Sequence, residues 1–129
     1  MTASAEEAAA AAGLDFHELP ARGVAITRMP RWVSAVLGPR AQAITLGRTV
    51  FVADDRLEDV VRGRAPELLA HELVHVRQWG RLGVARFLCV YLADYLRLRM
   101  LGLGHFDAYR HIGLEWEAYN EARRIVRAL

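Results

Sequence analysis

The order of apolar and polar residues predicts helices in the second half of the chain. From Pro66 to Gly80, apolar residues recur every three or four positions, which is typical of a helix with a buried face. Proline suits the first position of a helix, and Glu67 is favourable near its positive end. Further helices are predicted over residues 84–103 and 112–128. The chain is therefore expected to be mainly helical.

Short β-prone runs lie in the first half of the chain. Residues 24–27 form one β-branched run, and Pro30 follows it. Residues 43–46 and 49–52 form two more, separated by a glycine-containing pair. Two such runs around a short turn predict a β-hairpin. Together with the helices, this hairpin or small sheet predicts an α+β fold.

The remaining segments set the expected domain boundaries. Residues 1–20 are predicted to be an N-terminal tail, in which residues 1–12 form either a short helix ended by Gly13 or a frayed end, and His17 is a surface residue. Residues 21–129 are predicted to form a single domain. Residues 54–64 are strongly charged and predict a solvated connector. Residues 105–111 are predicted to be a loop or the start of the last helix.

Composition narrows the function classes. With 53% hydrophobic and 25% charged residues, the chain resembles an ordinary globular protein. All basic side chains are arginines and are scattered, so nucleic-acid binding is not expected. Cys89 is the only cysteine, which excludes an internal disulfide and fits a reducing compartment. The sequence shows no signal-peptide pattern and no transmembrane segment, so a cytoplasmic protein is expected.

The motif that carries chemistry is His-Glu-x-x-His, which runs from His71 to His75. Positions i and i+4 of a helix share a face, so both imidazoles can reach one ion. Zn²⁺ binds neutral imidazole, and catalytic zinc sites use three protein ligands and a water. Glu72 is then placed to take a proton from that water. The motif predicts a catalytic zinc centre whose third ligand comes from elsewhere in the chain.

The faces of this helix carry different residue types. Three apolar side chains form a stripe that is expected to face a core: Leu69, Leu73 and Val76. A second stripe lies nearly opposite: His71, His75 and Gln78. The arc predicted to face solvent holds Ala70, Val74, Arg77 and Arg81. Because unpaired buried polar groups are costly, the histidines need partners, which a metal ion or hydrogen bonds within the core would supply.

Two glutamates of the last predicted helix lie on opposite faces. Glu115 is surrounded by apolar, small and aromatic positions, whereas Glu117 lies with Glu121 and Arg124 on the side predicted to be solvated. A buried carboxylate needs a cation or strong hydrogen-bond donors. A zinc ion held by the two histidines would meet this need. An ion pair with an arginine such as Arg110 is the alternative.

With these residues the chain resembles the gluzincin metallopeptidases, in which His-Glu-x-x-His supplies two ligands and the base, and a later helix supplies a glutamate ligand. Residues 114–119 are similar to the Glu-x-x-Ala pattern of the CAAX-prenyl-protease-like branch and to small uncharacterised bacterial proteins. The resemblance covers about residues 43–125. It implies a zincin-like fold, the base Glu72 and the zinc ligands His71, His75 and Glu115. Where the branch often has an aspartate, this chain has Tyr119.

The function expected from the motif and the resemblance is hydrolysis of a peptide or protein substrate by a zinc-activated water. The strand predicted over residues 49–52 would align the substrate. A donor is also needed for the developing oxyanion. Four residues near Glu115 in the sequence are candidates: His105, Tyr109, His111 and Tyr119.

Two alternatives stay open. One is a non-catalytic zinc-binding or protein-interaction domain, which a fourth protein ligand from His105 or His111 would indicate. The other concerns the apolar helix over residues 84–103. This helix either packs against the motif helix or contacts a membrane surface or a partner.

Overall fold

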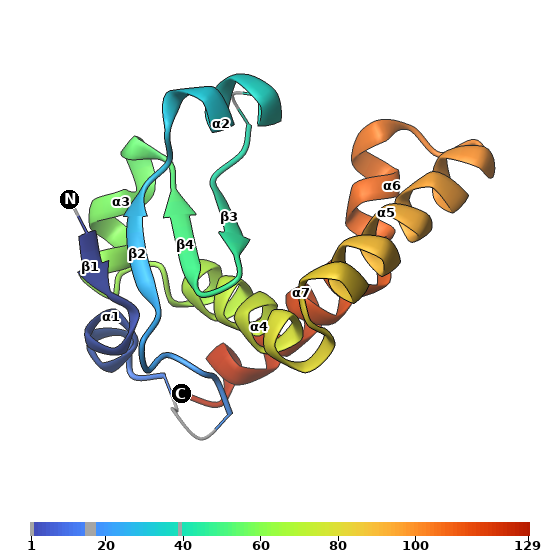
Figure 1. Cartoon of the computed structure of the whole chain (residues 1–129). Coiled ribbons are helices and arrows are strands. Elements are labelled where there is room, and N and C mark those ends of the chain that lie inside the picture. The colour runs from blue at the N-terminus through green and yellow to red at the C-terminus, as the bar shows by residue number, and fades with distance from the viewer. Residues whose placement is uncertain (1, 15–17, 39) are drawn as a thin grey trace.

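The chain forms one mixed sheet with helices around it (Figure 1). The computed structural model describes residues 2–14, 18–38 and 40–129. Its elements in chain order are β1 (Thr2–Ser4), α1 (Ala5–Ala12), β2 (Ala25–Arg28), α2 (Arg31–Leu37), β3 (Ala43–Leu46), β4 (Thr49–Val52), α3 (Asp54–Val61), α4 (Pro66–Leu82), α5 (Val84–Met100), α6 (His105–His111) and α7 (Gly113–Arg127). The α+β class expected from the sequence is confirmed.

The four strands lie in the order β1-β2-β4-β3. β3 and β4 are the predicted hairpin, paired antiparallel around Gly47, whose φ of 63° suits glycine. β2 pairs with β4 in parallel, and β1 pairs with β2 antiparallel. Because β4 has a neighbour on each side, the expectation that residues 49–52 align a substrate is wrong. The edge strand of the hairpin is β3.

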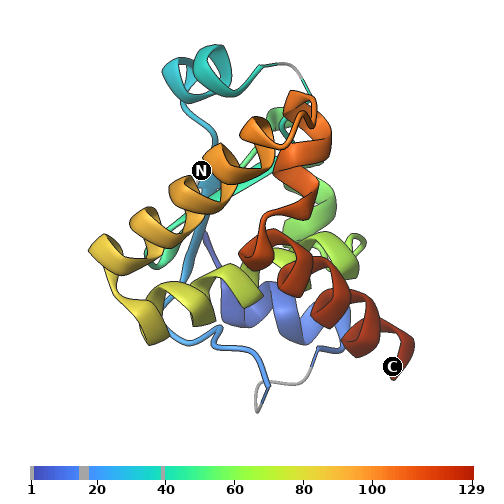
Figure 2. The same cartoon turned by 90° about the vertical axis from the view of Figure 1, so that its right-hand side faces the viewer.

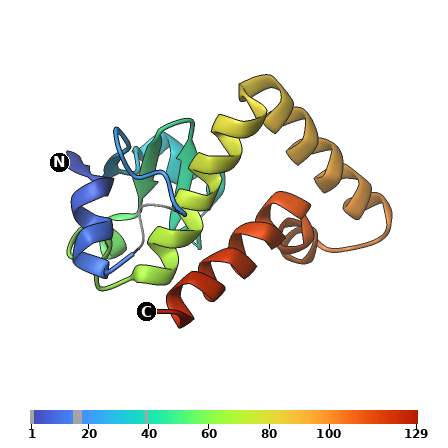
Figure 3. The ribbon, with the colours of Figure 1, turned by 90° about the horizontal axis from the view of Figure 1, so that it is seen from below.

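The helix α4 lies between the sheet and α7 (Figure 3). The two helices run antiparallel, since Arg81 lies beside Glu117 and Arg77 beside Glu121. The main core is formed between the sheet, α1, α3, α4 and α7. The stripe of α4 that was predicted to face a core is confirmed as buried: Leu69, Leu73 and Val76.

Two residues of α4 predicted to face solvent are completely buried. Ala70 and Val74 belong to the same core cluster as Ala118 and Ala122 of α7. Small side chains at these positions let the two helices approach closely. The periodicity of α4 alone could not show this second covered face, because the covering residues come from another part of the chain. The prediction is therefore wrong for Ala70 and Val74.

Residues 2–12 contain the short helix that is one of the two predictions for residues 1–12, and it ends at Gly13 as predicted, but this segment is part of the fold rather than a tail. They form β1, which adds a strand to the sheet, and α1, which packs into the core through Ala5, Ala8 and Ala9. A run of alanines has no contrast between faces, so its periodicity gives no sign of burial. The prediction for His17 lies outside the described residues.

Residues 54–61 form the helix α3 rather than a solvated connector. Leu57 and Val60 are buried on one face, while Glu58 and Asp59 pair with arginines on the exposed side. Two apolar residues at a spacing of three suffice to anchor this short helix on the core. In the sequence, the charged residues around Leu57 and Val60 make this short apolar face hard to recognise.

Gly63 lies where the connection between α3 and α4 touches the end of α1. Its φ of 77° is left-handed, and an added Cβ would lie 2.5 Å from the carbonyl carbon of Ala11. We therefore expect Gly63→Ala to lower the free energy of unfolding by about 3 kcal/mol, through backbone strain and a clash together. Denaturant unfolding measures this change.

The matched control for this prediction is Gly13→Ala. Gly13 has a φ of 76°, but nothing lies within 4 Å of an added Cβ. This variant adds the backbone strain without a clash, and we expect its free energy of unfolding to be lower by about 1–2 kcal/mol. Equal losses in the two variants would contradict the predicted clash between Gly63 and α1.

The helices α5 and α6 extend away from the sheet and are linked to α4 and α7 by a second, smaller core (Figures 1 and 2). Phe87 and Leu98 of α5 are buried in this core. Another side of α5 leaves apolar side chains exposed: Val84, Leu88, Leu92 and Leu96. The predicted helix is confirmed, and residues 105–111 are helical as α6. Within the described residues, no helix has both the length and the apolar character needed to cross a membrane.

Candidate metal centre

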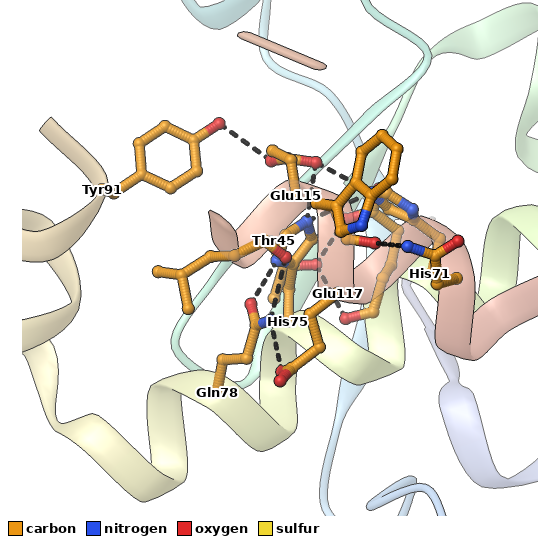
Figure 4. A network of polar contacts seen from close by, with 11 residues as sticks. Thr45, His71, His75, Gln78, Tyr91, Glu115 and Glu117 are labelled. Carbon is orange, nitrogen blue, oxygen red and sulfur yellow. Dashed lines mark hydrogen bonds and ion pairs between the residues drawn. The ribbon is translucent and has the colours of Figure 1, made fainter. Parts of the chain in front are cut away.

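The two motif histidines of α4 meet Glu115 of α7 in the interior of the protein (Figure 4). His71 and His75 are one helical turn apart, and their Nε2 atoms are 3.2 Å from each other. The Oε1 atom of Glu115 lies 3.1 Å from His71 Nε2 and 3.2 Å from His75 Nε2. Three potential ligand atoms thus form a nearly equilateral triangle.

The triangle fits a tetrahedral metal ion. With bonds of about 2.0–2.1 Å, the ligand atoms of a tetrahedral zinc ion lie about 3.3 Å apart. The observed separations of 3.1–3.2 Å are close to this value. All three side chains are buried, with residue exposures of 7% for His71, 5% for His75 and 3% for Glu115. This cluster is therefore able to hold a metal ion.

The electrostatics of the cluster favour a cation beside Glu115. Burial opposes a charge on His75, but its hydrogen bond to Glu115 and the Glu115 charge outweigh burial and raise the pKa of His75 to about 9. Burial also opposes a charge on Glu115. Hydrogen bonds to His71 and His75 outweigh this effect and hold the pKa of that carboxyl well below its usual range. The cluster thus stabilises one positive charge, which a proton or a metal ion can supply.

Gln78 fixes the orientation of His75. Its Nε2 atom donates to Leu114 O at 2.9 Å and to Glu117 Oε1 at 2.8 Å, which leaves its Oε1 atom as an acceptor. His75 Nδ1 lies 2.8 Å from this oxygen and must carry a proton, so Nε2 is the atom that faces the cluster and can bind either a second proton or a metal ion. Glu117 is only partly exposed and accepts a hydrogen bond, so the prediction of a simply solvated side chain is wrong.

Tyr91 of α5 holds the second oxygen of Glu115. Its hydroxyl donates to Glu115 Oε2 at 2.8 Å, while Oε1 faces the two histidines. Burial and the nearby carboxylates raise the pKa of Tyr91, so the hydroxyl keeps its proton and remains a donor. Glu115 thus accepts hydrogen bonds from His71, His75 and Tyr91, and the alternative ion pair with Arg110 is not formed in the described part of the chain.

Glu72 lies beside the cluster and is held by the edge strand. Thr45 Oγ1 of β3 donates to Glu72 Oε2 at 2.7 Å, and Trp79 Nε1 donates to Thr45 O at 3.0 Å. Glu72 is buried, with a residue exposure of 5%. Its Oε1 atom has no hydrogen-bond partner among the described residues, so this oxygen is available to accept a proton.

The four candidate oxyanion donors differ in their distance from the cluster. The ring centroid of Tyr119 lies 4.3 Å from that of His71. Tyr109 is close enough to Glu115 for the carboxylate to contribute, after burial, to a raised tyrosine pKa. His111 is exposed and stacks on Trp116, and His105 is bonded to Tyr95. Tyr119 and Tyr109 therefore lie nearest to the cluster.

No fourth ligand joins the three in the part of the chain that the structure describes. The group of histidine, cysteine and carboxylate side chains contains only His71, His75 and Glu115, and neither His105 nor His111 is part of it. A site with three protein ligands and an open position is typical of catalytic metal centres, whereas structural zinc sites are closed by four.

Comparison with known proteins identifies the family of the chain. The sequence model of the eCIS core domain matches residues 6–82, which is more than half of the chain. The chain belongs to the eCIS core domain family. The match includes the three residues of the motif to which the sequence assigns a role: His71, Glu72 and His75. Glu115 lies beyond the matched residues.

No curated protein and no solved structure matches the chain. The resemblance of the chain to gluzincins therefore stays a prediction, which rests on the motif and on Glu115.

Sequence reasoning missed three residues that support the candidate site. Gln78 shares a stripe with both histidines, which was a usable signal for its role. Tyr91 and Thr45 gave no such signal. They reach Glu115 and Glu72 from positions 24 and 27 residues away in the sequence, and only the packing of α5 and β3 brings them there.

Proposed function

We propose that this protein is a minimal zinc-dependent peptidase with a zincin-like arrangement of its active site. The observation that carries the proposal is the buried triangle of His71, His75 and Glu115, with no fourth described ligand and with Glu72 beside it. Nitrogen and carboxylate ligands in this number are those of catalytic zinc centres.

Zinc at this site would supply Lewis acidity, which makes a water molecule acidic near neutral pH and polarises a substrate carbonyl. The protein supplies the proton transfer. Thr45 fixes one carboxylate oxygen of Glu72, and the other is free to accept a proton from the attacking water. Glu72 then passes this proton to the leaving amine. Tyr119, whose ring contacts His71, is the favoured donor to the developing oxyanion.

The edge strand β3 is the expected guide for the substrate backbone. It lies at the margin of the sheet, and its Thr45 contacts Glu72 directly. Thr45 O bonds to Trp79 rather than to β4, so the backbone at this residue faces away from the hairpin partner. An extended peptide added along this edge would pass beside the proposed base.

A mixed peptide library tests the proposal. Zinc-loaded protein is incubated with the library, and new peptide termini are identified by mass spectrometry. We expect cleavage by the zinc-loaded protein, none by protein treated with a chelator, and recovery when zinc is restored. If the zinc-loaded protein leaves every library peptide intact, the peptidase proposal fails.

A second candidate function is a non-catalytic zinc-binding or interaction domain. Two observations favour it. The family name refers to the core of an extracellular contractile injection system, and α5 exposes an apolar stripe that includes Leu88 and Leu92. In that case zinc would stabilise the fold without peptide cleavage, and Glu72→Gln would not change binding to partners.

A further inference from the structure

A pocket of about 290 Å³ lies between α6 and α7, next to the metal centre. Its wall includes Arg110 and His111 from α6 and Trp116, Tyr119 and Arg123 from α7. The pocket lies beyond the residues matched by the family and shares no residue with the three-ligand cluster. Its chemistry therefore needs an explanation of its own.

The pocket carries a net positive charge, since two arginines face one acidic residue, Asp107. In the described part of the chain, Arg110 and Arg123 form no ion pair, whereas Arg77 and Arg124 both pair with Glu121 nearby. Two guanidinium groups without carboxylate partners at one concave surface favour an anionic ligand. Guanidinium binds carboxylates well because its planar fork of donors matches the two carboxylate oxygens.

The wall of the pocket also offers an apolar surface. The rings of His111 and Trp116 are stacked, with centroids 5.7 Å apart and planes at 20°. Trp116 is 56% exposed, so part of its indole surface is accessible. An aromatic surface beside two arginines suits a ligand with an aliphatic part and a charged end.

Tyr119 connects this pocket to the metal centre. It lines the pocket, and its ring centroid lies 4.3 Å from that of His71. A residue of an extended peptide spans about 3.3 Å, so a substrate at the metal centre has the pocket within reach of one of its next residues. The pocket is thus placed to bind a substrate residue close to the scissile bond.

We propose that the pocket is a specificity subsite in which Arg110 and Arg123 bind a carboxylate of the substrate. This inference rests on the peptidase function proposed above and adds the substrate class. The carboxylate belongs either to an acidic side chain beside the scissile bond or to the C-terminus of the substrate. Both sources present the same group to the two guanidiniums.

The test measures peptide binding to the zinc-loaded Glu72→Gln protein, in which cleavage does not interfere. Two blocked alanine pentapeptides are compared, one with glutamate and one with glutamine at the centre. A pentaalanine with a free C-terminal carboxylate is compared with its amide. The same titrations are repeated, at the same ionic strength, with a Glu72→Gln protein that also carries Arg110→Gln and Arg123→Gln. The matched control is the double change Arg86→Gln and Arg99→Gln, which removes two exposed charges of α5.

We expect one carboxylate peptide to bind at least about tenfold more tightly than its amide partner, as for hydrogen bonds to charged groups. The pocket variant should lose this preference and the α5 control should keep it. A preference in the glutamate pair assigns the pocket to a side chain, and one in the terminal pair assigns it to a chain end. The proposal would be overturned if charged and neutral peptides bound equally well. It would also be overturned if both double variants lost the carboxylate preference to the same extent.

Failure of this inference and failure of the peptidase function give different results. In both peptide pairs, cleavage of the carboxylate peptide and of its amide partner at equal rates by the wild type would refute the subsite and leave the peptidase. A carboxylate preference in binding that depends on Arg110 and Arg123, without any cleavage by the wild type, would refute the peptidase and leave the pocket assignment.

Discussion

Glu72→Gln is expected to abolish peptide hydrolysis while leaving zinc bound. Glutamine keeps the shape of the side chain and can still accept the Thr45 hydrogen bond, but it cannot take a proton from the attacking water. General base catalysis contributes about 10²–10⁴-fold to rates, and kcat should fall by that factor. Metal content should not change, because Glu72 is not one of the three ligands.

The control for this variant is Glu67→Gln, which makes the same chemical change on an exposed part of α4. It should retain wild-type rates. Rates are measured on a peptide selected from the library, and zinc by elemental analysis of the same samples. A Glu72→Gln protein with full zinc and more than about a tenth of the wild-type rate would show that another group acts as the base.

Glu115→Ala is expected to weaken zinc binding more than about 100-fold. The variant removes one of three ligands and leaves the hydroxyl of Tyr91 without its acceptor. Mutation of a residue that only supports a ligand lowers metal affinity about 10–100-fold, so removal of a ligand itself should lower it by more than that. The affinity is measured by competition with a chelator of known strength.

Glu117→Ala is the matched control two residues away on the same helix. Glu117 contacts Gln78 but not the histidines. Its replacement should therefore lower zinc affinity by only about tenfold, as for a residue that supports a ligand. Glu115→Gln adds a variant of nearly identical shape, in case the alanine protein fails to fold, and it should also bind zinc weakly. Equal effects at positions 115 and 117 would contradict the assignment of Glu115 as a ligand.

The hydrophobic pattern predicted the hairpin and the helices that carry the site. β-branched runs around Gly47 specified the β3–β4 pair, and Pro66 marked the start of α4. The helical faces also separated Glu115, which is buried, from Glu117, which is partly exposed. These features follow from the spacing of apolar and polar residues within short segments, which can be determined from the sequence alone.

Features that depend on contacts between distant segments were not predictable in this way. The burial of Ala70 and Val74 requires α7 to lie against α4, and the packing of α1 requires a sheet to receive it. The central position of β4 follows from its parallel pairing with β2, which no hairpin signal reveals. The contacts of Thr45 and Tyr91 with the site depend on the same tertiary arrangement.

The zinc content of the purified wild-type protein tests the metal centre most directly. We expect one zinc ion per chain after zinc loading and removal of loosely bound metal, because three buried side chains already place their ligand atoms at the separations that a tetrahedral ion requires. A protein that is folded but retains no zinc under these conditions would contradict the assignment of His71, His75 and Glu115 as a metal centre.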